Sequence, residues 1–77
     1  MQLIVKTLTG QKLNFTFEPD NTIMDIKNAV QEREGIDASQ IKLIFGGKNL
    51  NDEMKISDYN LEPGSTLIMV LTLRGGF

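Results

Sequence analysis

The sequence contains no cysteine, no histidine and no tryptophan, and aromatic residues make up only 6% of its 77 residues. Without cysteine the chain has no disulfide and no thiol chemistry, which suits a cytoplasmic or nuclear protein. Without histidine the serines and threonines lack their usual general base, and the nitrogen and sulfur ligands of most metal sites are missing. These absences predict a protein that is not an enzyme, with no catalytic residues, no metal site and no cofactor.

Long apolar runs and a strong net charge are also missing. No run approaches the ~20 residues of a membrane helix, and the first residues resemble a strand rather than a signal peptide. Eight basic and ten acidic residues give a net charge of −2, which argues against nucleic-acid and membrane-surface partners. With 40% apolar residues, the chain has the composition of one small globular domain, which we expect to be a monomer.

The residues that are present alternate as in strands around one helix. Leu3 and Val5, then Leu13, Phe15 and Phe17, alternate with polar residues on either side of a turn over 7–10, which predicts an N-terminal hairpin. A helix is predicted from near Ile23 to about Glu34, because Thr22 as N-cap forms a near capping box with Asp25 and Gly35 suits a left-handed C-cap. Its apolar stripe contains Ile23, Ile26 and Val30.

The remaining chain predicts, in order, a strand over 41–45, a turn at 46–47, a short extended segment over 48–50, one helical turn within 51–60, a turn over 62–65 and a strand from 67. The Leu, Ile and Val content of 67–71 indicates a strand with both faces nearly covered. We therefore predict an α+β fold, in which a mixed sheet of four or five strands packs on one helix. If the first and last strands are parallel neighbours, the hairpin and helix between them serve as the long crossover that they require.

The strand alternation leaves several apolar residues on the face away from the helix: Leu8, Ile44, Ile68 and Val70. We call these four residues the apolar patch. Cationic residues lie beside them in the same strands and turns: Lys6, Lys42, Lys48 and Arg74. An apolar centre with a positive rim is typical of a protein-docking surface. The alternatives are that a dimer partner or the chain's own terminus covers it.

Several stretches resemble the ubiquitin family along the whole chain: Val5-Lys6-Thr7-Leu8-Thr9-Gly10, Glu34-Gly35-Ile36, Leu43-Ile44-Phe45, Ser57-Asp58-Tyr59-Asn60 and Leu73-Arg74-Gly75-Gly76. The resemblance implies a β-grasp domain over 1–72 and a flexible tail over 73–77. It also implies a protein modifier, whose terminal glycine is adenylated, passed between enzyme thiols and joined to a lysine of a target. Such a modifier has activating, conjugating and ligase enzymes, deconjugating proteases and ubiquitin-binding domains as partners.

The resemblance assigns roles to particular residues. Leu8, Ile44 and Val70 match the family's main docking patch, and Ile36, Leu71 and Leu73 match a second one. Gly75 and Gly76 match the conjugation site, and the additional Phe77 resembles a precursor residue removed before activation, or else a remnant of cloning. Thr72 and Arg74 match contacts to the activating enzyme, and Lys48, Lys6 and Lys27 match chain-linkage lysines. Lys27 would pair with Asp52, which would make it a weak acceptor.

Departures from the family set limits on this assignment. Thr72 replaces an arginine and Ile68 replaces a histidine, while other linkage lysines are replaced by Gln11, Ala29, Arg33 and Pro63. Lysines stand where the family has none at Lys12, Lys42 and Lys55. Two other functions fit the fold: a non-conjugated ubiquitin-like binding domain, which would not need Gly75 and Gly76, and an assembly protein that dimerises through its open sheet face.

Overall fold

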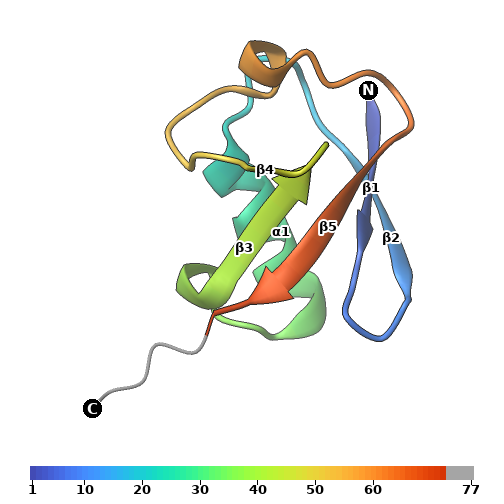
Figure 1. The fold of residues 1–77 in the computed structure, drawn as a ribbon, viewed down its shortest axis with the longest axis vertical. Coiled ribbons are helices and arrows are strands. Elements are labelled where there is room, and N and C mark those ends of the chain that lie inside the picture. Colours follow the sequence, from blue (N-terminus) through green and yellow to red (C-terminus); the bar gives the residue numbers. More distant parts are fainter. Residues whose placement is uncertain (73–77) are drawn as a thin grey trace.

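The computed structural model describes residues 1–72, and the tail predicted over 73–77 lies outside the described residues. The described chain forms β1 (Gln2–Lys6), β2 (Lys12–Thr16), α1 (Ile23–Glu34), the 3₁₀ helix η1 (Ala38–Gln40), β3 (Ile41–Phe45), β4 (Lys48–Asn49), the 3₁₀ helix η2 (Ile56–Tyr59) and β5 (Ser65–Leu71) (Figure 1). The predicted order of hairpin, helix, strand, short strand and strand is confirmed.

The strands form one mixed sheet in the order β2-β1-β5-β3-β4. The first and last strands, β1 and β5, are parallel neighbours at the centre, and the other three strand pairs are antiparallel. Figure 1 places α1 behind the sheet, on one of its two sides. The chain between β1 and β5, which contains β2, α1, β3 and β4, provides the long connection that parallel neighbours require.

Side chains at both ends of α1 fix where the helix begins and ends. The Thr22 hydroxyl accepts a hydrogen bond from the Asp25 N–H at 3.3 Å, and the Asp25 carboxylate accepts one from the Thr22 N–H at 2.9 Å. This capping box satisfies N–H groups that have no partner inside the helix. The Thr22 N–H, followed by the Asn21 amide, lowers the pKa of Asp25. Gly35 ends the helix with φ 73°, which glycine adopts at little cost.

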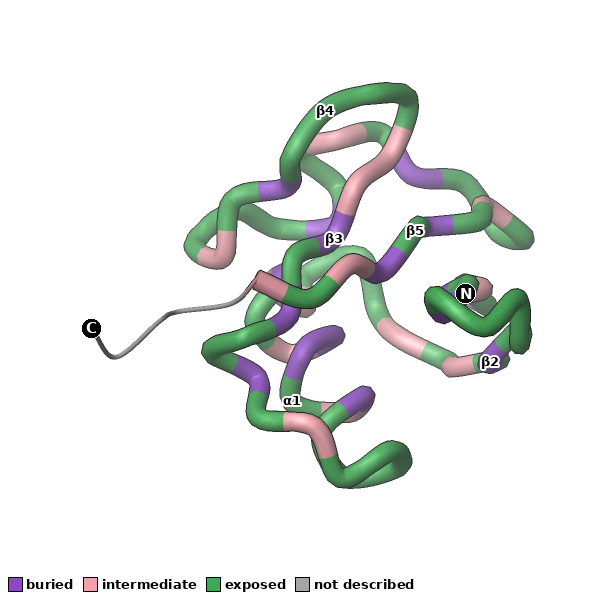
Figure 2. Tube along the Cα trace, turned by 60° about the horizontal axis from the view of Figure 1, so that its bottom comes forward, coloured by how far each residue is buried: buried purple, intermediate pink, exposed green. Residues whose placement is uncertain are grey.

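The core lies between the sheet and α1 and includes every member of the predicted helix stripe. Leu3, Val5, Ile26, Leu43 and Leu67 are fully buried. Figure 2 shows the buried segments on α1, β3 and β5 where they approach one another. Of the helical turn predicted within 51–60, Ile56 is buried and Tyr59 packs against the core.

The final strand differs from its prediction in two ways. It begins at Ser65, so the turn that precedes it is shorter than expected. The prediction that both faces are nearly covered is wrong, since Ile68 is 48% exposed and Leu71 is 41% exposed. Ile68 is exposed because α1 covers only the other face of the sheet, whereas Leu71 lies on the helix side at the last residue of β5.

Candidate functional site

The strand registers bring three members of the apolar patch together on the open face of the sheet. Ile68 of β5 lies directly opposite Ile44 of β3, and Val70 lies opposite Lys42. Partners directly opposite each other point to the same face of a sheet, so Ile44, Ile68 and Val70 are neighbours. Leu8 lies in the turn after β1 and is 62% exposed.

The predicted cationic rim is confirmed at two of its positions. Lys6 of β1 lies opposite Ile68, and Lys42 lies opposite Val70. Lys48 pairs with Phe45 at the end of β3, so its strand position belongs to the helix side of the sheet. There it lines a shallow hollow of about 260 Å³ together with Phe45 and Tyr59. Arg74 lies outside the described residues.

Sequence reasoning missed Lys12 as a member of this face. In the β1–β2 pairing Lys12 lies directly opposite Lys6. Lys12, Lys6, Ile68 and Ile44 therefore form one row across four strands. The two-residue alternation of β2 already put Lys12 on the side away from Leu13, but the row depends on register, which alternation alone does not give.

The described residues of the second predicted patch, Ile36 and Leu71, lie on the helix side of the sheet. Leu71 pairs with Ile41, a buried residue, so Leu71 points toward the helix side at the end of β5. Ile36 follows the C-cap of α1 and packs, half-buried, against the core. Leu73 lies outside the described residues. Leu71 and Ile36 therefore lie away from the open face that carries Ile44, Ile68 and Val70.

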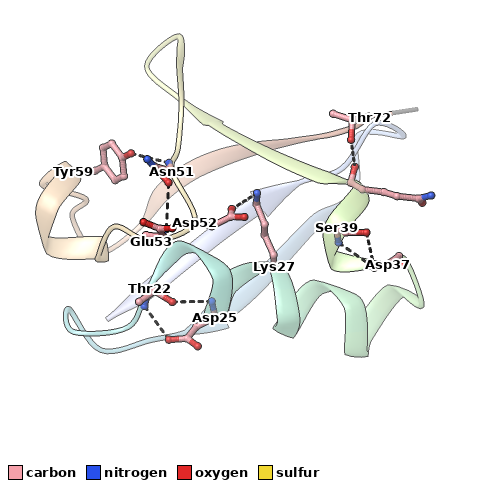
Figure 3. Close-up of polar contacts among 11 residues, drawn as sticks. Thr22, Asp25, Lys27, Asp37, Ser39, Asn51, Asp52, Glu53, Tyr59 and Thr72 are labelled. Carbon is pink, nitrogen blue, oxygen red and sulfur yellow. Dashed lines mark hydrogen bonds and ion pairs between the residues drawn. The ribbon is translucent and has the colours of Figure 1, made fainter. Parts of the chain in front are cut away.

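Thr72 is tied to the backbone of η1 (Figure 3). Its N–H donates to the Gln40 carbonyl oxygen at 2.7 Å, and its hydroxyl donates to the same oxygen at 3.2 Å. Thr72 is half-buried and is the last described residue. The short side chain is thus engaged by its own chain at the point where the predicted tail begins, and Gly75, Gly76 and Phe77 lie outside the described residues.

The three predicted linkage lysines have different environments. Lys6 and Lys48 are exposed, whereas Lys27 of α1 is buried and forms an ion pair with Asp52 (Figure 3). This confirms the expected pairing of Lys27 with Asp52. A buried, paired ammonium is a poor nucleophile because it must lose its partner and its proton before it can react.

Over residues 1–72 the structure has no helix long and apolar enough to cross a membrane. Within the same residues no three carboxylates gather closely enough to hold a metal ion.

Comparisons with known proteins agree with this geometry. The model of the family described as "Ubiquitin family" matches residues 3–74. The chain is 49% identical over 76 residues to the ubiquitin-like protein NEDD8 of Dictyostelium discoideum, covering 99% of both chains. It is 43% identical over 72 residues to the NEDD8-like protein RUB1 of Saccharomyces cerevisiae, covering 94% of both.

A further relative has a different size. The AN1-type zinc finger protein 4 of Mus musculus is 37% identical over 76 residues, which is 99% of this chain but 10% of that protein. A similar sequence thus occurs inside a much longer chain.

The chain belongs to the ubiquitin family and has its β-grasp fold, as the family match, the full-length relatives and the mixed sheet packed on one helix show.

Proposed function

We propose that this chain is a ubiquitin-like modifier, joined through Gly76 to lysines of target proteins after removal of Phe77. The observation that carries the proposal is the arrangement of β5. This strand holds Ile68 and Val70 on the open face, and the chain then continues through Thr72 toward Gly75 and Gly76. One strand thus connects a docking surface with a reactive end. The full-length similarity to two NEDD8-type proteins supports the same function.

The glycines suit the chemistry that this function requires. The carboxylate of Gly76 would be adenylated with ATP, transferred to enzyme thiols as a thioester, and finally attacked by a lysine amine of the target. Each enzyme must approach the terminal carbonyl closely, and residues without side chains leave room for that approach. In the sequence Phe77 follows Gly76, so that carboxylate becomes free only when a protease cleaves the bond between them.

The apolar patch would be read by conjugating enzymes, ligases, deconjugating proteases and ubiquitin-binding domains. Thr72 and Arg74 would contact the activating enzyme, and Ile36, Leu71 and Leu73 would form a second contact surface. The exposed lysines Lys6 and Lys48 would accept further copies in chains, and Lys27 would do so weakly because it is buried and paired. These reactions would take place in the cytoplasm and nucleus.

A thioester assay tests the proposal. The intact chain and a version ending at Gly76 are mixed with ATP and with ubiquitin-activating or NEDD8-activating enzyme, and thioesters are resolved on a non-reducing gel. We expect the version ending at Gly76 to be charged by at least one enzyme and the intact chain not to be charged. A version ending at Gly75 is the control for the terminal residue. Charging of the intact chain with Phe77 retained would contradict the precursor role of Phe77.

The second candidate function is a non-conjugated binding module. It is favoured by the occurrence of a similar domain within the long mouse protein. In that case the version ending at Gly76 would not be charged by any activating enzyme, while Ile44→Ala would still weaken partner binding. Charging in the same assay therefore separates the two functions.

A further inference from the structure

β2 is the outermost strand on one side of the sheet, next to β1 (Figure 1). Within the described residues β2 pairs with β1 alone, so its other edge has no strand beside it. A free strand edge presents unpaired N–H and C=O groups, which readily pair with a strand of another molecule. The groups on this edge therefore determine whether a further strand can join the sheet.

The hairpin register shows which groups of β2 point outward. The Thr7 N–H donates to the Gln11 carbonyl oxygen at 2.8 Å. At the other end of the hairpin the Phe17 N–H donates to the Met1 carbonyl oxygen at 2.8 Å. Opposite residues of an antiparallel pair alternate between bonded and non-bonded positions, so every second residue of β2 directs its backbone groups away from β1. These outward residues, which we call the β2 edge, are Lys12, Asn14 and Thr16.

Arg33 in the last turn of α1 occupies the middle of the β2 edge. Its Nη1 donates to the Asn14 carbonyl oxygen at 3.1 Å, and its guanidinium carbon lies 5.5 Å from the centre of the Phe15 ring. The second contact is a cation–π interaction, which holds the guanidinium beside the strand. An incoming strand would need the same Asn14 carbonyl, so Arg33 competes with it directly.

The β2 edge is complementary to itself when two copies meet in antiparallel orientation. With Asn14 opposite Asn14 of a second copy, Lys12 of each copy faces Thr16 of the other, and all three outward residues of both strands can pair. No lysine then lies opposite a lysine, whereas a pairing centred on Lys12 would place like charges face to face. The contact is isologous, because the same residues of both copies form it around a two-fold axis. The carbonyl that Arg33 binds thus belongs to the residue on that axis.

From this arrangement we infer that the β2 edge is a pairing surface for a second copy of this chain and that Arg33 blocks it. Each copy brings its own Arg33, so pairing has to displace both guanidinium groups from the two central carbonyls. This double block keeps the parent chain monomeric. The inference is independent of the proposed conjugation, since none of the residues assigned to conjugation belongs to the β2 edge.

Sedimentation of the full chain over a range of concentrations tests the role of Arg33. In Arg33→Ala both central carbonyls can accept a hydrogen bond from the other copy, so we expect self-association to tighten by about tenfold or more. Mixed pairs of the parent chain and Arg33→Ala, with one of the two labelled, should have an intermediate affinity. Lys55→Ala is the matched control, because Lys55 is exposed, bridges to Thr22 away from β2 and carries the same charge. It should sediment like the parent chain.

A second substitution on the Arg33→Ala background locates the contact. The Asn14 N–H points outward, so Asn14→Pro removes a bond of the paired edge and leaves the bonds between β1 and β2 in place. We expect this double variant to return to the weak self-association of the parent chain. Urea midpoints of all variants check that the fold is kept.

A cross-link gives a readout that does not depend on proline. The chain has no cysteine, so Asn14→Cys introduces its only thiol. On the Arg33→Ala background a short bifunctional maleimide should join two copies of Asn14→Cys efficiently. Asn49→Cys is the control, because Asn49 is an exposed asparagine of β4, the strand at the opposite edge of the sheet. It should be joined far less.

Three results would overturn the inference. The first is an Arg33→Ala chain that stays monomeric at every concentration. The second is association of Arg33→Ala that Asn14→Pro leaves unchanged and Ile44→Ala abolishes, which would assign the contact to the open sheet face. The third is equal cross-linking of Asn14→Cys and Asn49→Cys, which would show that the copies meet without a fixed edge.

Discussion

Lys27 of α1 and Asp52 of the segment between β4 and η2 form an ion pair in which the lysine is buried and the aspartate is exposed to solvent. The Lys27 side chain is 9% exposed, whereas the Asp52 side chain is 40% exposed. Two backbone bonds join the same segments, from the Met24 N–H to the Asp52 carbonyl at 3.2 Å and from the Ile23 N–H to the Met54 carbonyl at 2.9 Å. The ion pair therefore holds the segment between β4 and η2 against α1. The same segment accepts hydrogen bonds from N–H groups in the first turn of that helix.

The two partners of this pair should not contribute equally to stability. Asp52→Asn leaves the buried Lys27 ammonium without a counter-charge, so we expect the free energy of unfolding to fall by about 1–3 kcal/mol. Lys27→Met keeps an apolar stem of similar length and leaves a carboxylate that water can reach, so its cost should be below about 1.5 kcal/mol. Urea unfolding of both variants shows which one loses more stability. A larger loss of unfolding free energy in Lys27→Met than in Asp52→Asn would contradict this account.

Amine reactivity offers a direct measure of the lysine environments. Brief treatment of the folded chain with an acetylating reagent, followed by peptide mass spectrometry, should modify Lys6 and Lys48 first and Lys27 last. In Asp52→Asn the modification of Lys27 should become faster, because the Lys27 side chain is no longer held in the ion pair. The same order in the urea-unfolded chain would show that intrinsic reactivity, and not the fold, sets it.

The helix cap predicts a dependence of stability on pH. The pKa of Asp25 is lowered in the folded chain, so the ionised carboxylate contributes stability above its unfolded value of about 3.8 and loses that contribution as the pH falls through the folded pKa. We expect the free energy of unfolding of the parent chain to be higher than that of Asp25→Ala by about 0.5–2 kcal/mol at pH 7, and by less at pH 2. The pKa of Asp37 is also lowered, by the Ser39 N–H, but both proteins keep that residue. A difference that is constant with pH would refute the role of the charge.

Core and surface residues of the sheet should respond very differently to truncation. Leu43→Ala and Ile26→Ala remove fully buried side chains, so each should cost about 2–5 kcal/mol. Ile68→Ala removes a side chain that is 48% exposed and should change stability by less than about 1 kcal/mol. Denaturation midpoints measure all three, and unchanged midpoints in both core variants would rule out this packing.

The last prediction concerns Thr72 and uses a version of the chain ending at Gly76. An arginine at this position can form charge-assisted hydrogen bonds to enzyme carboxylates, worth about 1.5–3 kcal/mol each. Thr72→Arg should therefore raise charging by a standard ubiquitin-activating enzyme by roughly ten- to a hundredfold. With a dedicated enzyme that reads Thr72, the same change should reduce charging.

A control variant separates the hydroxyl of Thr72 from its size. Thr72→Val keeps the backbone bond to Gln40 and removes the second hydrogen bond, so its charging reports only the loss of the hydroxyl. Thioester formation is followed at several concentrations of each protein. If the parent chain and Thr72→Arg are charged at equal rates by both enzymes, this position does not discriminate between them.

The sequence predicts much of this fold because the helix and the strands are specified locally. Thr22, Asp25 and Gly35 mark both ends of α1 by hydrogen-bonding and backbone preferences that act within one turn. Strand alternation likewise identifies Ile44, Ile68 and Val70 as outward residues. What alternation does not give is coverage, because an apolar run such as 67–71 has the same composition whether its outer face meets a helix or solvent.

The rest of the site depends on contacts between distant residues. The opposition of Lys6 and Lys12 requires the hairpin register. The two hydrogen bonds from Thr72 to the Gln40 carbonyl oxygen join residues 32 positions apart. Neither the alternation nor a single residue type encodes such contacts, since they follow from how the strands pair. The placement of Lys48 on the helix side also follows from its pairing with Phe45, which a two-residue strand hardly signals.

The parallel pairing of β1 and β5 has a mechanical consequence. In parallel neighbours, the start of one strand and the end of the other lie at opposite ends of the pair, so a pull on residues 2 and 71 slides the strands along each other. The hydrogen bonds between them then carry the load together. A pull on residues 2 and 16, at the open end of the β1–β2 pairing, would open that antiparallel pair one bond at a time. We therefore expect this domain to resist tension along its chain better than tension across its hairpin.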